Sequence, residues 1–155
     1  MSLKPILIDA LEAWDWDDPV QTDEDGTRHR VATNYELDGA VYRLFVEAHD
    51  DVALLKVYAY ALFVVPEARH VEACVLLNRL NKNVYAGHFD LAGDRVRYVH
   101  VVDVENCPTS PQILTNMLLS ATRALYPPRM RAVEALALTE RSVADIVREY
   151  EEAGD

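Results

Sequence analysis

The sequence predicts one α+β domain built around a five-stranded antiparallel sheet, in the order α-β-β-β-α-β-β-α with further C-terminal helices. Two observations carry this prediction. Asp38-Gly39 and Gly93-Asp94 are two-residue turn signals, and each separates two runs of alternating apolar and polar residues, as in β-hairpins. Before, between and after these runs, apolar residues recur at the three- and four-residue spacing of amphipathic helices.

The N-terminal region predicts a helix followed by a linker. The helix is expected over about residues 3–14, with Pro5 in its first turn, where a missing N–H is tolerated. An acidic linker over about residues 15–28 follows. It does not match a calcium loop, because Pro19 takes the third ligand position counted from Asp15, so we interpret the linker as solvated.

The first hairpin turn sets the register of the next strands. A turn at Asp38-Gly39 pairs Tyr35 with Tyr42 and Val31 with Val46. A second turn at Asp50-Asp51 would then pair Val46 with Leu55, Leu44 with Val57 and Tyr42 with Ala59. The face expected to carry the core consists of Val31, Thr33, Tyr35, Tyr42, Leu44, Val46, Leu55, Val57 and Ala59.

The opposite face of the predicted sheet mixes charged and aromatic residues, and Arg43 is expected opposite Tyr58 as a cation–π pair. Its apolar members form the candidate partner surface: Phe45, Leu54, Tyr58 and Tyr60. A C-terminal helix expected over about residues 139–152, capped by Thr139, carries a second apolar stripe at Val143, Ile146, Val147 and Tyr150. Either this helix covers the sheet face or a second copy does, and we expect a homodimer.

The second half of the chain predicts a helix, a hairpin and two further helices. The first helix runs from Pro66 to about Asn81, and its broad apolar face consists of Val71, Cys74, Val75, Leu76, Leu77 and Leu80. In the hairpin, Asp90 is expected opposite Arg97 as an exposed ion pair. Ser110 is expected to cap a helix that stops at Pro127-Pro128, and a shorter helix covers about residues 129–138.

No residue pattern in the sequence predicts catalysis or metal binding. His70 and Cys74 share a helix face, but nothing supplies an orienting group or an oxyanion hole. His88 and Asp90 share a strand face with two arginines, which disfavour a divalent cation. We therefore expect no catalytic residue, no cofactor site and no metal site, and we predict that the protein is not an enzyme.

Composition limits the class of partner. The chain has 155 residues, which suits the single domain expected over residues 1–155, with a core at about 30–135. Its formal net charge of −11 repels phosphate backbones and anionic membranes, so we expect neither as a partner. Two cysteines, Cys74 and Cys107, and the lack of a signal peptide or a bilayer-length apolar run favour a cytoplasmic location.

One segment resembles a known family. Residues 77–81 read LNRLN and residues 87–91 read GHFDL, similar to the L-N-x-x-N…G-x-F-x-L signature of the YbjN-like bacterial proteins. Tyr42 to Glu47 and Tyr126-Pro127 also stand where that family would place them, so the resemblance covers about residues 30–135. It implies a sensory transduction regulator with a fold similar to type III secretion chaperones, often dimeric and without catalytic residues.

From the residues alone, the motif is open to two interpretations. Asn78 and Asn81 could bond backbone at a helix end, with Asn81 in left-handed geometry, and Gly87 could mark a bulge or a close backbone approach. Alternatively, the amides could bind a ligand. We predict a non-catalytic protein-interaction module, chaperone-like or regulatory, with an unidentified protein partner; the alternative is a small-molecule or peptide-binding protein.

Overall fold

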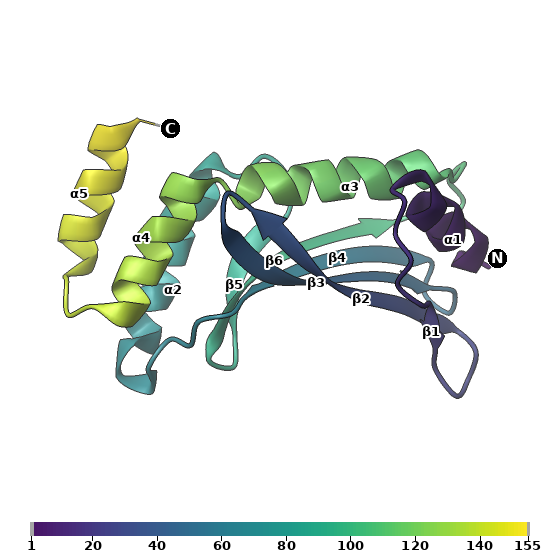
Figure 1. The fold of residues 1–155 in the computed structure, drawn as a ribbon, viewed down its shortest axis with the longest axis horizontal. Helices are drawn as coiled ribbons and strands as arrows, with labels where there is room; N and C mark the ends of the chain where they lie inside the picture. The colour runs from purple at the N-terminus through teal and green to yellow at the C-terminus, as the bar shows by residue number, and fades with distance from the viewer. Residues whose placement is uncertain (1, 155) are drawn as a thin grey trace.

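The structure is a computed structural model, and it describes residues 2–154. Its helices are α1 Lys4–Ala13, α2 His70–Leu80, α3 Pro111–Ala124, α4 Pro127–Leu138 and α5 Val143–Ala153. Its strands are β1 Gln21–Thr22, β2 Arg28–Leu37, β3 Ala40–His49, β4 Leu54–Ala61, β5 His88–Ala92 and β6 Arg95–Asp103 (Figure 1). Short 3-10 turns, η1 Glu67–Arg69 and η2 Asn81–Asn83, flank α2. The predicted mixed α+β class and antiparallel sheet are confirmed.

The described sheet has six strands, in the order β1-β2-β3-β4-β6-β5, so the prediction of five was wrong. The extra strand, β1, lies inside the segment interpreted as a solvated linker. The Asp23 carboxylate accepts hydrogen bonds from the Thr27 and Arg28 amides at 2.9 and 3.0 Å, and Gly26 is left-handed at φ 71°. This Asx-type turn folds the linker back onto β2.

The register of the first hairpin is confirmed, with Tyr35 opposite Tyr42 and Val31 opposite Val46. The second register was wrong by two residues, because Val46 pairs with Val57 and Tyr42 with Ala61. The connection from β3 to β4 spans residues 50–53, and Asp50 is held elsewhere: its carboxylate accepts the Leu3 amide at 2.7 Å. A shift of two residues keeps the same side chains on the core face.

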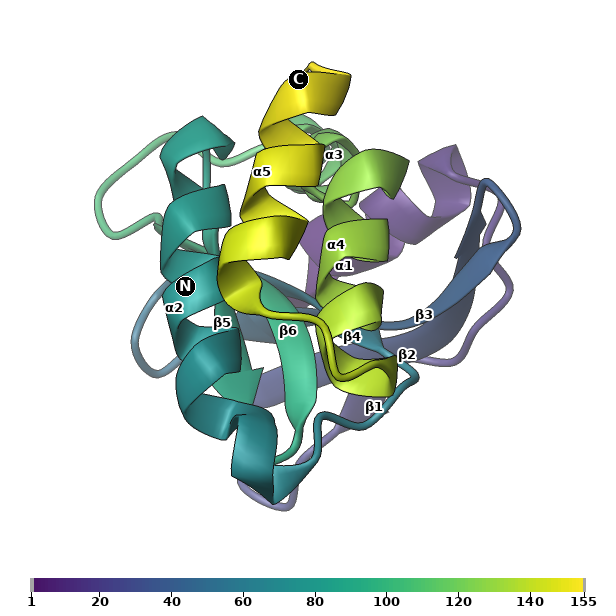
Figure 2. The same ribbon diagram turned by 90° about the vertical axis from the view of Figure 1, so that its left-hand side faces the viewer.

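The helices form two groups (Figures 1 and 2). Helices α1 and α3 lie across one face of the sheet, while α2, α4 and α5 pack together at one end. The covered face is the predicted one, since these residues are buried: Val31, Tyr42, Leu44, Val46, Leu55, Val57 and Ala59. Thr33 and Tyr35 are only partly buried because β2 lies near the sheet edge, and Tyr35 Oη lies 3.0 Å from Thr122 Oγ1 on α3.

The apolar face of α2 is narrower than predicted. Ala73, Leu76, Leu77 and Leu80 are buried, whereas Val71, Cys74 and Val75 are exposed. This helix packs on one side, against α4, α5 and β5, so the outer part of its apolar face stays exposed. His70 directs Nε2 to the Val65 carbonyl at 3.0 Å rather than to Cys74.

Two predicted helix caps were wrong. The side chain of Ser110 makes no cap bond, although its carbonyl accepts the Ile113 amide. Ser142, not Thr139, caps α5, because its hydroxyl accepts the Asp145 amide at 3.1 Å. Helix α5 buries Ile146, Val147 and Tyr150 while packing on α4 and α2. It therefore does not cover the sheet.

Candidate functional site

The face of the sheet opposite α1 and α3 carries no helix among the described residues (Figure 1). We call it the outer face. The alternation of each strand places on it the four residues predicted as a partner surface, namely Phe45, Leu54, Tyr58 and Tyr60, all partly buried. Their burial comes from neighbouring side chains on the same face rather than from an overlying element.

Arg97 organises the centre of the outer face. Its guanidinium donates two hydrogen bonds to the Asp90 carboxylate, from Nε at 2.9 Å and from Nη2 at 2.5 Å. Its Nη1 donates to Tyr60 Oη at 3.3 Å. The same group lies 5.2 Å from the centre of the Tyr58 ring. The hydrogen bonds that Arg97 donates to the Asp90 carboxylate raise the pKa of Arg97. The predicted pairing of Asp90 with Arg97 is confirmed, but the pair is partly buried rather than exposed.

The predicted pairing of Arg43 with Tyr58 was wrong, because the two-residue shift places Arg43 opposite Tyr60. Arg43 donates to Asn34 Oδ1 at 3.1 Å, and its guanidinium lies 5.7 Å from the Phe45 ring. Arg30 stacks more closely on the same ring, at 4.5 Å. Phe45 and Tyr60 meet edge to face, with ring centres 5.6 Å apart.

The charge of the outer face differs from that of the whole protein. It holds six basic side chains against four acidic ones: Arg28, Arg30, Arg43, Lys56, Arg95 and Arg97, with Glu36, Glu47, Asp90 and Asp103. The chain as a whole carries −11. Burial, together with the charge of Glu47, raises the pKa of Tyr58, so this tyrosine keeps its proton. The face therefore offers neutral aromatic rings framed by arginines.

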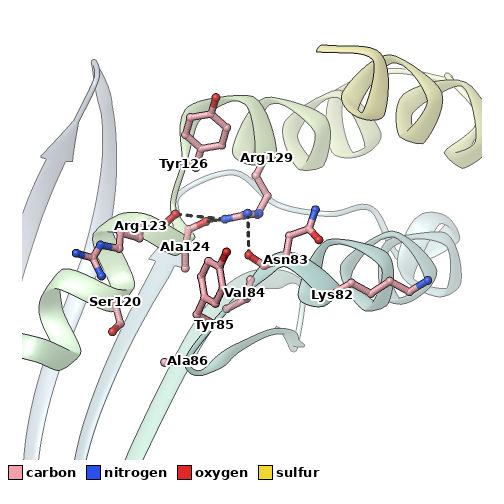
Figure 3. Close-up of a pocket in the computed structure, with 10 residues that line it drawn as sticks. All are labelled: Lys82, Asn83, Val84, Tyr85, Ala86, Ser120, Arg123, Ala124, Tyr126 and Arg129. Carbon is pink, nitrogen blue, oxygen red and sulfur yellow. Dashed lines mark hydrogen bonds between the residues drawn. The ribbon is translucent and has the colours of Figure 1, made fainter. Parts of the chain in front are cut away.

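A groove of about 680 Å³ lies where η2 and the loop before β5 approach the junction of α3 and α4 (Figure 3). Its described lining includes Lys82, Tyr85, Arg123 and Tyr126 and no carboxylate. In Figure 3, Lys82 and Arg123 extend to opposite sides of the groove, and the Tyr85 ring stands between them.

Arg129 lines this groove and links the two segments that form it. It is 3% exposed and donates to the carbonyls of Ala124, Arg123 and Asn83 at 2.7, 3.3 and 3.3 Å (Figure 3). The first two carbonyls belong to the last turn of α3, where backbone acceptors lack helical partners. Sequence reasoning missed Arg129, and the signal available was an arginine directly after the helix-breaking Pro127-Pro128 pair.

The family-like motif holds the edge of the sheet. The Asn81 side chain accepts the Phe89 amide through Oδ1 at 2.7 Å and donates Nδ2 to the Phe89 carbonyl at 2.9 Å, as a neighbouring strand would. Asn81 is right-handed at φ −61°, so the expected left-handed geometry was wrong, and Asn78 is exposed. A Cβ at Gly87 would meet the Val99 carbonyl oxygen at 2.4 Å, as the predicted close approach requires.

Two histidines that sequence reasoning did not single out are buried. His29 lies between Thr22 Oγ1 at 3.0 Å and Asp50 Oδ2 at 3.3 Å. His49 contacts Glu47 at 2.8 Å. Burial raises the pKa of Asp50, but hydrogen bonds from the Leu3 amide and His29 outweigh burial and hold the pKa below its ordinary value of 3.8. The contacts of His29 and Asp50 link β1 and the start of α1 to β2, whereas the His49 contact lies within β3.

The described residues contain no group of three or more His, Cys, Asp and Glu side chains that could hold a metal ion. Asp90, proposed beside His88 as a candidate ligand and rejected, is bound to Arg97. Among residues 2–154, no helix combines the length and the apolar character that crossing a bilayer requires.

Comparison with known proteins identifies the family. A family model described as "YbjN: Putative bacterial sensory transduction regulator" matches residues 6–123. The chain belongs to the YbjN family. The match begins in α1 and includes the acidic linker, so the predicted start at about residue 30 was too late, and it ends within α3.

A solved structure of a YbjN protein has the same fold. It is described as "Crystal structure of YbjN, a putative transcription regulator from E. coli", with 14% sequence identity and a TM-score of 0.53. The comparison covers 85% of this chain and 90% of that chain. At this identity the likeness establishes the fold. No curated protein matches the chain.

Proposed function

We propose that this YbjN-family protein is a non-catalytic, cytosolic regulatory module that binds a protein partner through its outer face, in the manner of a small chaperone or regulator. The observation that carries the proposal is an open sheet face whose aromatic residues are already fixed by arginines. Phe45 is stacked under Arg30, and Tyr58 and Tyr60 are held by Arg97. Tyrosine and arginine are enriched where protein interfaces gain most of their binding energy.

Preorganisation supports the same proposal. Side chains that are held in place before binding lose little conformational freedom when a partner covers them. The bidentate contact from Arg97 to Asp90 fixes the guanidinium that in turn orients both tyrosines. An excess of basic over acidic groups on this face favours a partner surface that is apolar at its centre and acidic at its margin.

The test compares two aspartate substitutions. Tyr58→Asp places a charge in the centre of the outer face, while Val71→Asp places the same charge on the exposed side of α2, where valine is 78% exposed. Proteins captured from the bacterial cytosol by the wild-type chain and by Val71→Asp, but lost with Tyr58→Asp, are partners of the outer face. Each is then purified and titrated calorimetrically against all three chains. Equal binding to all three would contradict the proposal.

The groove favours a second candidate function, the binding of a small anionic molecule. Its volume of about 680 Å³ falls in the usual range for small ligands, and its exposed charged groups, Lys82 and Arg123, are both basic. Inorganic phosphate, citrate and ATP serve as probes in melting experiments. A stabilisation that Arg123→Glu abolishes and that Lys56→Glu, on the outer face, leaves intact would support this function. No stabilisation by any probe would count against it.

A further inference from the structure

The two edges of the sheet differ in whether their outward-facing backbone N–H and C=O groups already have hydrogen-bond partners. At one end, the Arg28 carbonyl accepts the Asp23 amide at 3.0 Å, and the Arg28 amide donates to the Asp23 side chain at 3.0 Å. The backbone N–H and C=O of Arg28 therefore point away from β3. Because backbone direction alternates along a strand, Arg30, Ala32, Asn34 and Glu36 also point outward.

The hairpin turn confirms this assignment independently. Leu37 and Ala40 flank the two-residue turn and pair with each other, so the backbone N–H and C=O of Leu37 point toward β3. Those of Glu36, the residue before, therefore point away from β3. Strand β1 reaches only as far as Gln21, which pairs with Arg30. Within the described chain, no strand pairs with the outward amides and carbonyls from Ala32 to Glu36.

The opposite end of the sheet is closed. On β5 the outward-facing residues are Phe89 and Leu91, and the Asn81 side chain already takes both the amide and the carbonyl of Phe89. The outward groups that remain on β5 are those of Leu91, two residues before the turn, and one residue is too short a run to bind another strand. Strand β2 is thus the end of the sheet that can accept another strand.

We propose that the free edge of β2 pairs with the same edge of a second copy of this chain, antiparallel and centred on Asn34. The outer-face row of β2 reads Arg28, Arg30, Ala32, Asn34 and Glu36, with positive charge at its start and negative charge at its end. Such a row complements itself only when two copies run in opposite directions.

In this pairing, Glu36 lies opposite Ala32 of the partner subunit and diagonal to the partner's Arg30. Diagonal neighbours across antiparallel strands lie about 7–8 Å apart, within reach of long side chains, and the small alanine leaves room for the contact. On the covered face, Tyr35 lies opposite the partner's Thr33, an aromatic and β-branched pair that suits adjacent strands. Asn34 does not obstruct the edge, because Arg43 holds its side chain on the outer face.

Self-pairing at this edge shares only Arg30 with the proposed partner site, and it does not depend on Tyr58 or Tyr60. The sheets of the two copies become continuous, and the two outer faces lie side by side. The Tyr58 substitution that tests partner binding therefore leaves the self-association unchanged, so the two proposals can fail separately.

Sedimentation of the full chain at micromolar concentration tests the pairing. The wild-type chain is expected to be a dimer. Asn34→Pro removes one outward amide and places a proline ring on the edge, which an edge strand tolerates when its N–H points outward. We expect this variant to raise the dimer dissociation constant about 100-fold or more while its circular dichroism stays that of the wild type. Asn34→Ala loses the bond to Arg43 but keeps the amide, and should remain dimeric.

A charge exchange provides a test that does not depend on proline. Glu36→Arg sets like charges together across the dyad and is expected to weaken the dimer, and the double variant Arg30→Glu, Glu36→Arg is expected to restore it. A wild-type monomer at these concentrations would overturn the proposal. So would a dimer that Asn34→Pro leaves intact, or a double variant no stronger than Glu36→Arg.

Discussion

Gly87 allows a direct test of the close approach between the loop before β5 and strand β6. Its backbone is left-handed at φ 71°, and a Cβ built on it would lie 2.4 Å from the Val99 carbonyl oxygen and 2.6 Å from the Tyr98 hydroxyl. Gly26 has the same φ of 71° with nothing within 4 Å of the corresponding position. The two glycines thus share a conformational requirement and differ in their surroundings.

The expected magnitudes follow from this difference. Alanine in a left-handed conformation costs about 1 kcal/mol, so Gly26→Ala should lower the free energy of unfolding by about that amount. Gly87→Ala carries the same cost and also forces the Val99 backbone or the Tyr98 ring to move, because a carbon and an oxygen rarely approach within ~3.3 Å. Overpacking of this kind adds about 1–3 kcal/mol, and losing the hydrogen bond from Tyr98 to the Ala86 carbonyl adds about 1 kcal/mol.

We therefore expect Gly87→Ala to lower the free energy of unfolding by about 3–5 kcal/mol, and its melting temperature by roughly 10 °C. Urea denaturation of both variants and the wild type measures the free energy of unfolding, provided that the three chains have the same m-value, the slope of that free energy against urea concentration. If the two variants lose the same free energy, the reasoning is refuted, because left-handed geometry would then account for the whole effect at Gly87.

Two further predictions concern other anchoring contacts. Asn81→Ala should lower the free energy of unfolding by about 1–3 kcal/mol, because the partly buried amide and carbonyl of Phe89 lose their partners. The same variant should speed amide exchange in β5. Asn78→Ala, on the exposed side of the same motif, should change the free energy of unfolding by less than about 0.5 kcal/mol. The pKa of Asp50 is held below 3.8 because bonds from the Leu3 amide and His29 outweigh burial, so the ionised form stabilises the fold above that pH. Asp50→Asn should therefore be less stable than the wild type at about pH 7, and the gap should close as pH falls through the folded pKa; a gap that persists unchanged to about pH 2 would contradict the assignment.

The fold was predictable where local chemistry decides it. The Asp38-Gly39 turn fixed the first hairpin to the residue, since a type I′ turn allows one register. The second turn was missed because the carboxylate of Asp50 is used by Leu3, a residue 47 positions away, and no local pattern reports such a contact. Strand β1 was not predicted for a related reason, because it depends on a turn at Asp23 rather than on β-forming residues.

The candidate site was predictable in part. Alternation along β3 and β4 placed Phe45 and Tyr58 on the outer face whichever register the turn adopted, since the error was an even number of residues. The identity of each contact was not predictable, because Arg97 reaches Tyr58 from a strand that is distant in sequence. Arg129 was missed because it bonds backbone carbonyls, those of Arg123 and Ala124 at the end of α3 and that of Asn83 before β5, and backbone carbonyls carry no signature of residue type.

The amide of Asn81 has a consequence for how far copies of this chain can assemble. Strand addition that uses two different edges can repeat without limit and yields filaments, whereas addition that uses one edge twice stops at two copies. By occupying the backbone of Phe89, Asn81 removes the acceptor edge that a growing filament would need. If the proposed pairing through β2 holds, the Asn81 side chain restricts it to two copies. Asn81→Ala is then expected to show turbidity on prolonged incubation before it unfolds.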